Sequence, residues 1–285
     1  MQNESPSIGL VHPGAMGSAI GRALVVADAS RAVLWASDGR SFETKARASA
    51  AGLVDVGDLA MLTSSVDTIV SVCPPGSALE LAEQVAGTGF PGRYIDANAV
   101  SPATARAIAD CFADVVDGGI VGPPPTRPGT TRMYLSGSNA AAAASLFAAS
   151  DLEVRVVDGG AGAASAVKMC FAGWTKGTSA LLFALRALAE AEGVTDALLA
   201  EWETSMPDLI TRSERSPATI GPKSWRFEPE MQEIAASFAA AGLPDGFHRS
   251  AAEIYGRMDR FKGRPNGGAD STTLAEVVAA LLAHD

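Results

Sequence analysis

In the first half of the chain, segments with the hydrophobic pattern of a strand alternate with segments that have the pattern of a helix. Short apolar runs rich in β-branched residues are separated by alanine-rich segments with helical periodicity. This alternation is typical of parallel strands connected by helices. The runs that we interpret as strands are Ser7–Val11, Ala32–Ala36, Thr68–Cys73, Arg93–Ala97, Asp114–Asp117 and Met133–Ser136. The predicted helices between them are Gly17–Ala27, Ser77–Val85, Pro102–Cys111 and Ala140–Ala148.

The periodicity changes near residue 160. After one more short strand, Glu153–Asp158, a glycine-rich turn leads to a long apolar segment from Ala163 to about Glu192, and the rest of the chain has helical periodicity. We therefore predict an α/β fold with a Rossmann-type doubly wound sheet in residues 1–158 and an all-helical domain in residues 159–285. Thr273 and Glu276 have the spacing of a capping box, which predicts the start of the last helix.

Composition narrows the class of protein. The chain has 285 residues, 47% of them hydrophobic, so it can bury a large core. The net charge of -10 is unfavourable for binding nucleic acid phosphates. The sequence shows no signal peptide and no uninterrupted apolar run of about 20 residues, and its three cysteines are widely separated. These features predict a cytoplasmic protein with reduced thiols that binds no nucleic acid, membrane or metal.

A strand, a glycine turn and a helix follow one another at the start of the chain. In this arrangement the first helical turn points its N–H groups at an anion such as a pyrophosphate. Gly14 would permit close approach of the backbone, and Gly17 would let the helix pack closely on the strand. His12 stands where the first glycine of G-x-G-x-x-G is expected. The residues predicted to line the cofactor here are Gly9, His12, Pro13, Gly14, Ala15, Met16 and Gly17.

The residues after the second predicted strand select between NAD and NADP. Ser37 falls at the strand end and Arg40 follows closely. A hydroxyl and a guanidinium suit a 2′-phosphate, so NADP(H) is the predicted cofactor. Asp38 would accept a hydrogen bond from the ribose of NAD if the strand ended one residue later, so NAD(H) is the alternative.

Four motifs between residues 8 and 169 form a recognisable set: Gly14-x-Met16-Gly17 after Ile8-Gly9, Val72–Pro75, Asp96–Pro102 and Gly162–Met169. Together they resemble motifs of the β-hydroxyacid dehydrogenase superfamily, which includes 3-hydroxyisobutyrate and 6-phosphogluconate dehydrogenases and, more distantly, imine reductases. The resemblance implies that Lys168 is the catalytic acid/base. It also implies cofactor contacts at Cys73, Pro74, Pro75 and Asn98.

Three departures from the superfamily affect the predicted substrate site. The superfamily's asparagine four residues after the lysine is Ala172 here, its Ser-Gly-Gly segment is Val121–Pro123, and its later Lys-Asp pair falls on Glu230–Met231. A site without that amide, hydroxyl and cation should not clamp a small hydroxy acid. The candidates for a rebuilt substrate pocket are Val121, Gly122, Trp174, Glu230 and His248, with His248 as an alternative proton donor.

These features predict an NADP(H)-dependent oxidoreductase that interconverts an alcohol and a carbonyl in a small hydroxy-acid-like molecule. Lys168 would move the proton. Reduction of C=N bonds is one alternative, although imine reductases usually carry Asp or Tyr at the lysine position. A non-catalytic nucleotide-binding protein is the other. Four leucines, which would give the long helix a wide apolar face, and the resemblance together predict a homodimer through the helical domain: Leu181, Leu182, Leu185 and Leu188.

Overall fold

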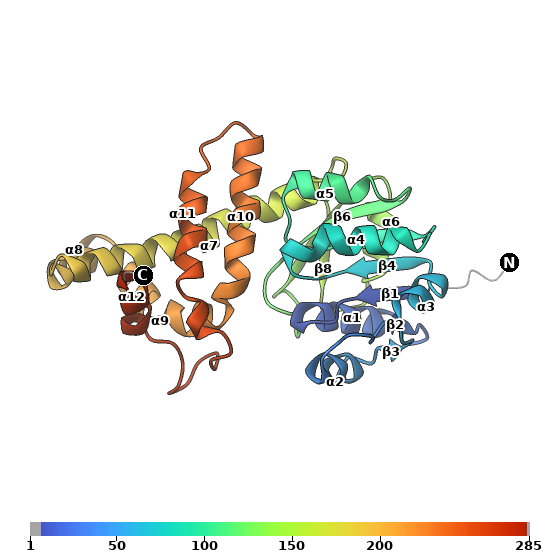
Figure 1. Cartoon of the computed structure of the whole chain (residues 1–285), viewed down its shortest axis with the longest axis horizontal. Helices are drawn as coiled ribbons and strands as arrows, with labels where there is room; N and C mark the ends of the chain where they lie inside the picture. The colour runs from blue at the N-terminus through green and yellow to red at the C-terminus, as the bar shows by residue number, and fades with distance from the viewer. Residues whose placement is uncertain (1–6, 284–285) are drawn as a thin grey trace. The chain divides into compact units, whose positions relative to one another are not determined.

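A computed structural model of the chain describes residues 7–283, which form two compact units (Figure 1). Unit 1 comprises the described residues up to Met169, and unit 2 comprises those from Cys170 onward. The long helix α7 (Ala163–Ala191) begins in unit 1 and continues into unit 2. None of the described helices is long and apolar enough to cross a membrane.

Unit 1 contains an eight-stranded sheet in the order β3-β2-β1-β4-β5-β6-β7-β8. The pairing is parallel except between β6 and β7. The first six strands therefore have the order 3-2-1-4-5-6, and the predicted doubly wound sheet is confirmed. The strands are β1 (Ile8–Val11), β2 (Val33–Trp35), β3 (Val54–Asp55), β4 (Thr68–Ser71), β5 (Arg93–Asp96), β6 (Val115–Val121), β7 (Arg132–Ser136) and β8 (Glu153–Val156).

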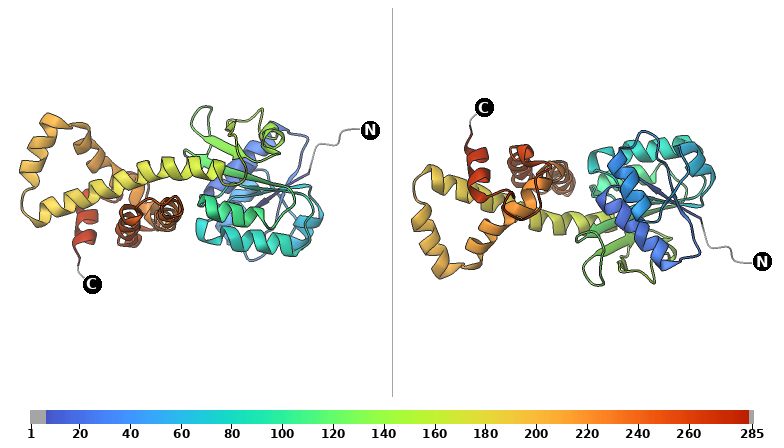
Figure 2. Two further views of the ribbon diagram at one scale, coloured as in Figure 1. Left: turned by 90° about the horizontal axis from the view of Figure 1, so that it is seen from above. Right: turned by 90° about the horizontal axis from the view of Figure 1, so that it is seen from below.

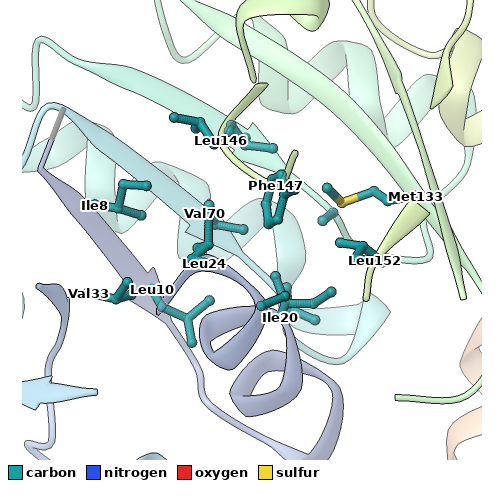
Figure 3. Packing of buried hydrophobic residues seen from close by; sticks show 14 of the residues in the cluster. Ile8, Leu10, Ile20, Leu24, Val33, Val70, Met133, Leu146, Phe147 and Leu152 are labelled. Atoms are coloured by element: carbon teal, nitrogen blue, oxygen red, sulfur yellow. The ribbon is translucent and has the colours of Figure 1, made fainter. Parts of the chain in front are cut away.

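Helices cover both faces of this sheet (Figure 2). One apolar cluster joins the sheet to α1 and α6, and a second joins it to α3, α4 and α5. Side chains alternate along each strand, so Ile8 and Leu10 of β1 face the first cluster and Val11 faces the second. Figure 3 shows Ile20 and Leu24 of α1 in the first cluster. The helices of unit 1 are α1 (Ala15–Ala27), α2 (Phe42–Ala50), α3 (Leu59–Ser64), α4 (Ala78–Gly87), α5 (Pro102–Ala109) and α6 (Ala140–Ser145).

Two strands differ from their prediction. β3 was not predicted because it has only two residues, both exposed, which leave no periodic signal. β6 runs four residues beyond the predicted end at Asp117, through two glycines that normally disfavour strands. A Cβ at Gly118 would lie 2.7 Å from the Asp96 carbonyl oxygen, so only glycine fits there.

Unit 2 is helical throughout its regular structure, as predicted. Its helices after α7 are α8 (Thr195–Ser205), α9 (Asp208–Ile220), α10 (Ser224–Ala240), α11 (Gly246–Gly256) and α12 (Leu274–Leu282). α10 and α11 lie side by side (Figure 1). The capping box is present, since Thr273 Oγ1 accepts from Glu276 N at 3.3 Å and Glu276 Oε2 accepts from Thr273 N at 2.9 Å.

The division between the units falls at Met169, whereas the change of periodicity predicts a boundary after residue 158. The first turns of α7 account for the difference because they are bound to the sheet. Asp117 of β6 accepts hydrogen bonds from the backbone N–H groups of Gly162 and Ser165, at 2.9 and 3.0 Å. Periodicity marks where strands stop, but tertiary hydrogen bonds determine which unit a helical turn joins.

Candidate functional site

The strand order of unit 1 reverses between β1 and β4, which are neighbours in the sheet with Val11 opposite Ser71. In open parallel sheets, ligands bind beyond the carboxyl ends of the strands at such a point. The turn that joins β1 to α1, residues 12–14 and here called the glycine turn, follows β1. The predicted cofactor residues from Cys73 to Pro75 follow β4. The topology therefore brings these two segments to the same edge of the sheet.

The glycine turn presents an uncapped helix N-terminus. Gly14 is the N-cap residue of α1, no side chain caps the helix there, and its first turn contains no acidic residue. Gly14 N donates to the His12 carbonyl oxygen at 2.8 Å, which folds the turn tightly. The N–H groups of the first turn of α1 and the helix dipole thus favour an anion at this position.

The three glycines of this region have different roles. A Cβ at Gly17 would lie 2.5 Å from the His12 carbonyl oxygen, so α1 could not pack on the turn with any other residue. A Cβ at Gly14 would meet only the His12 ring, at 3.6 Å, so internal packing does not require glycine there. Gly9 lies within β1 against Leu62 and Val66, which gives it a role in the core. Among the other residues of this region, Pro13 is buried, Met16 is half-buried and Ala15 is exposed.

Arg40 reaches back from the turn after β2 to the glycine turn. Its Nη1 lies 3.0 Å from His12 Nδ1, and its backbone N donates to the Ser37 carbonyl oxygen at 3.1 Å. Ser37 is buried and its hydroxyl donates to Asp55 at the end of β3. Burial alone would raise the pKa of Asp55, but hydrogen bonds from Ser37 and Gly57 keep that pKa below its ordinary value. Arg40 and His12 are therefore brought together, whereas the Ser37 hydroxyl already has an acidic partner.

A buried hydrogen-bond network fixes the loop after β4. Asn98 Oδ1 accepts from Cys73 N at 2.6 Å, and Asn98 Nδ2 donates to Ser71 Oγ at 3.1 Å and to Asp96 Oδ1. Pro75 then begins a short 3-10 helix, with Pro74 as its N-cap residue. Burial raises the pKa of the Cys73 thiol to about 12, so this cysteine is not a nucleophile at neutral pH. The network orients loop backbone rather than presenting reactive groups.

Asp96 makes the stability of the protein depend on pH. Its carboxyl group is 1% exposed, and burial, followed by the charge of Asp117 on the neighbouring strand, raises its pKa from 3.8 to about 8. The folded state therefore favours the protonated carboxyl. We expect the stabilisation from the protonated carboxyl to be fully present below about pH 4, to be lost as the pH rises to about 8, and to stay absent above that pH. The loss amounts to about 6 kcal/mol at 1.4 kcal/mol per pKa unit.

Urea unfolding of the wild type and of Asp96→Asn at several pH values tests this expectation. The asparagine variant carries no titrating group at this position, so the difference between the two proteins isolates Asp96. Equal changes in the free energy of unfolding of both proteins between pH 5 and pH 8.5 would contradict it.

Lys168 lies on α7, in unit 1, directly against β6. A Cβ at Gly119 would come within 2.7 Å of Lys168 Cβ and 2.9 Å of the Ala164 carbonyl oxygen, so glycine permits this approach. Asp117 pairs in register with Asp96, and Gly119 lies two residues further along β6. Lys168 therefore stands toward the carboxyl ends of the parallel strands, the same edge of the sheet as the glycine turn.

The candidate substrate residues do not gather in one place within unit 1. Val121 is buried at the end of β6. Gly122 has a φ of 119°, and a Cβ at this position would clash with the Thr130 carbonyl oxygen. Gly122 is therefore needed for the connection to β7. Three others belong to unit 2: Trp174, Glu230 and His248.

Within unit 2 these three residues have distinct surroundings. Trp174 is 70% exposed on α7. His248 is 5% exposed, and its ring centroid lies 4.2 Å from that of Phe238 and 5.1 Å from that of Phe247. Burial lowers the pKa of His248, so the ring is neutral at pH 7. His248 is thus a core histidine of unit 2, and its role as a proton donor stays a prediction.

Glu230 forms a buried ion pair with Lys176 in unit 2. The distance between Lys176 Nζ and Glu230 Oε1 is 3.0 Å, and Lys176 Nζ lies 4.9 Å from the centroid of the Phe227 ring. The Lys176 carbonyl oxygen accepts from Tyr255 Oη at 2.8 Å. Because both charges are largely removed from water, losing one leaves the other without compensation.

We therefore expect Glu230→Ala to lower the free energy of unfolding by about 3 to 5 kcal/mol in urea titrations. The double variant Lys176→Met, Glu230→Met removes both charges and should recover most of that loss. A Glu230→Ala protein as stable as the wild type would show that the pair is not structural, and would return Glu230 to the substrate candidates.

Sequence reasoning missed three residues with charges at or near the site: Arg47, Asp55 and Asp117. Arg47 lies on α2 and lowers the pKa of His12, after burial and Arg40. The start of α2 could have been predicted from its N-cap serine, because Ser41 Oγ accepts from Thr44 N at 3.3 Å. Asp117 carried no such signal, because it caps a helix that begins 46 residues later in the chain.

Comparisons with known sequences give two matches, each to part of the chain. Residues 189–258 match the model of a family described as a domain of unknown function, DUF1932. An uncharacterised 28.5 kDa protein of Methanothermus fervidus is 31% identical over 163 residues. That match covers 56% of this chain and 63% of the relative, so it spans less than two thirds of the relative's length.

Solved structures match almost the whole chain. A conserved hypothetical protein from Sinorhizobium meliloti 1021 is 22% identical, with a TM-score of 0.67 over 98% of this chain and 97% of that chain. The 3-hydroxyisobutyrate dehydrogenase of Mycobacterium tuberculosis, solved with L-serine, is 16% identical, with a TM-score of 0.64 over 98% and 99%. A reductive aminase from Aspergillus terreus, solved with NADPH and ethyl levulinate, is 16% identical, with a TM-score of 0.54 over 97% and 99%.

At these identities the likeness is one of fold. It extends over both the sheet and the helical region. This chain therefore has the same fold as the 3-hydroxyisobutyrate dehydrogenase and the reductive aminase.

Proposed function

We propose that the protein is an NADP(H)-dependent oxidoreductase that interconverts an alcohol and a carbonyl group in a small molecule, with Lys168 as the acid/base. The observation that carries this proposal is the position of Lys168 in unit 1. It lies on the sheet edge that also holds the glycine turn, and Gly119 permits its close contact with β6. The bound cofactor would supply or accept the hydride.

The glycine turn supports a dinucleotide at this edge. The uncapped N-terminus of α1 would hold the pyrophosphate, with Gly14 leaving room for it and Gly17 keeping α1 close to the turn. The solved relatives include a complex with NADPH, which supports a nicotinamide cofactor. Arg40 supports NADP over NAD because its guanidinium suits a 2′-phosphate.

Reduction of a C=N bond is the second candidate. Ala172 replaces the amide that the motif resemblance places beside the lysine, and Val121 replaces a hydroxyl, so a carboxylate clamp is not supported. A reductive aminase is among the proteins of the same fold. A lysine that donates a proton suits a carbonyl oxygen, which favours the alcohol and carbonyl reaction as the first candidate.

Binding and turnover assays separate these possibilities. Calorimetric titration should give a lower dissociation constant for NADPH than for NADH, and tighter NADH binding would overturn the choice of cofactor. NADPH absorbance should then fall with ketones or oxo acids in a substrate panel. Turnover of cyclic imines alone would establish the second candidate, and NADPH binding without any turnover would favour a nucleotide-binding protein that is not an enzyme.

We also propose that the protein is a homodimer through the helical domain and works in the cytoplasm. All three cysteines are free thiols, which suits a reducing compartment.

The large side chains exposed on α7 follow a heptad-like spacing of 3, 7, 4 and 3 residues, typical of a helix that packs on a partner. They are Phe171, Trp174, Leu181, Leu185 and Leu188.

Charged substitutions on this face should dissociate the dimer. We expect the double variant Leu181→Glu, Leu188→Glu to sediment as a monomer, because burying two carboxylates at an apolar interface is unfavourable. Val26→Glu, at an exposed apolar position on α1, is the matched control and should keep the assembly of the wild type. A monomeric wild type in analytical ultracentrifugation would contradict the dimer.

A further inference from the structure

His12 has a backbone conformation that normally belongs to glycine. Its φ is 64°, and among residues 7–283 it is the one non-glycine residue with a positive φ. The left-handed region is sterically unfavourable for residues with a Cβ, although histidine enters it more often than most. Glycine would adopt this conformation without that penalty. A side chain kept at such a position is a candidate for a functional role.

The His12 ring lies between Arg40 and the N-terminus of α1. Its Nδ1 is 3.0 Å from Arg40 Nη1. On the other side, a Cβ at Gly14 would lie 3.6 Å from His12 Cδ2 and 3.8 Å from Nε2. The ring therefore joins the two groups of this edge that attract anions, the guanidinium and the helix N-terminus.

The electrostatic surroundings of the ring are positive. The charged groups that act on it are Arg40, in the turn after β2, and Arg47, on α2; Glu43, also on α2, faces Arg47. Burial, then Arg40 and Arg47, lower the pKa of His12, so the imidazole is neutral at pH 7. Its Nδ1 consequently accepts the hydrogen bond from Arg40, and its Nε2 carries the proton.

We propose that His12 and Arg40 recognise the 2′-phosphate of NADP as one unit. The neutral ring of His12 orients the guanidinium before the phosphate binds; on binding, the ring takes up a proton from solvent and ceases to accept from Arg40, which then turns to the phosphate. This inference rests on the proposed NADP(H) function. A phosphate dianion near two arginines and the imidazole would favour the imidazolium. Arg40 could then bind the phosphate while the protonated ring donates to it, so the affinity for NADPH would be linked to pH through His12.

The test compares the wild type with His12→Gln and His12→Gly by calorimetric titration of NADPH and NADH at pH 6 and pH 8. The 2′-phosphate itself titrates near pH 6, but this contribution is common to all three proteins. We expect the NADPH preference of the wild type, relative to His12→Gln, to increase about tenfold from pH 8 to pH 6. Binding of NADH should be the same in all three, and His12→Gly should not lower the melting temperature.

Arg22→Gln is the matched control for charge, since Arg22 is exposed on α1 and its loss removes one positive charge from the same unit. It should keep the preference and pH dependence of the wild type. Histidine variants with the wild-type preference at both pH values would overturn the inference and leave the proposed function intact. Equal loss of NADPH and NADH would also overturn it, because His12 would then only shape the turn. A wild type without preference for NADPH would overturn the choice of cofactor together with the inference.

Discussion

Replacing Lys168 by methionine is expected to lower turnover by about 10²- to 10⁴-fold, the usual contribution of a positioned acid/base group. Methionine keeps the length and apolar character of the lysine stem, so contact with Gly119 on β6 is preserved. The cofactor residues lie on other segments, around the glycine turn and the loop after β4. The dissociation constant for NADPH should therefore stay at the wild-type value while the rate of NADPH oxidation collapses.

Two further variants distinguish proton transfer from a role of charge alone. Lys168→Arg keeps the positive charge, but a guanidinium does not release its proton in proteins, so turnover should stay low. Lys262→Met removes an exposed lysine of unit 2 and should behave as the wild type. If Lys168→Arg restores turnover, the lysine acts by its charge. If Lys168→Met turns over normally, the proposed acid/base role is wrong.

The local structure of the glycine turn could be predicted from the sequence because its signals are local. Gly14, Gly17 and the strand before them lie within ten residues, and short-range sterics determine what fits there. The same holds for Thr273 and Glu276, whose reciprocal hydrogen bonds span three residues. Where interactions within a short segment determine its structure, the sequence of that segment is enough to predict the structure.

Contacts that join distant segments could not be read in this way. The sequence places Ser37 at a strand end, but only the structure shows that its hydroxyl is bound to Asp55 of β3. It suggests Glu230 as a pocket residue, while the structure gives the carboxylate a partner in Lys176, 54 residues away. In each case the residue that determines the role of the side chain belongs to another element. The sequence alone does not show that the two side chains lie together.

The largest loss of stability is expected from Asp117→Ala. The carboxylate is 1% exposed and accepts four hydrogen bonds: from Gly162 N at 2.9 Å, Ser165 N at 3.0 Å, Ser165 Oγ at 2.6 Å and Ser136 Oγ at 3.1 Å. Alanine would leave buried N–H groups at the start of α7 without an acceptor. Each such bond to a charged group contributes about 1.5 to 3 kcal/mol, so losing four of them should lower the free energy of unfolding by about 6 kcal/mol or more in urea titrations.

Asp110→Ala, at the exposed end of α5, is the control and should change the free energy of unfolding by no more than about 0.5 kcal/mol. Because Asp117 anchors the turn that precedes Lys168, its loss should also lower turnover. An Asp117→Ala protein as stable as the control would contradict the capping role.

Asp117→Asn tests whether this cap and the titration of Asp96 are coupled. The amide keeps the shape of the side chain and one oxygen acceptor, so the loss of stability should be smaller than in the alanine variant. It also removes the negative charge that helps to raise the pKa of Asp96. The pH range over which stability falls should therefore end below pH 8 and the total decrease should shrink, because the folded-state pKa of Asp96 moves toward its ordinary value. An unchanged pH profile of the unfolding free energy would show that burial alone sets the protonation of Asp96.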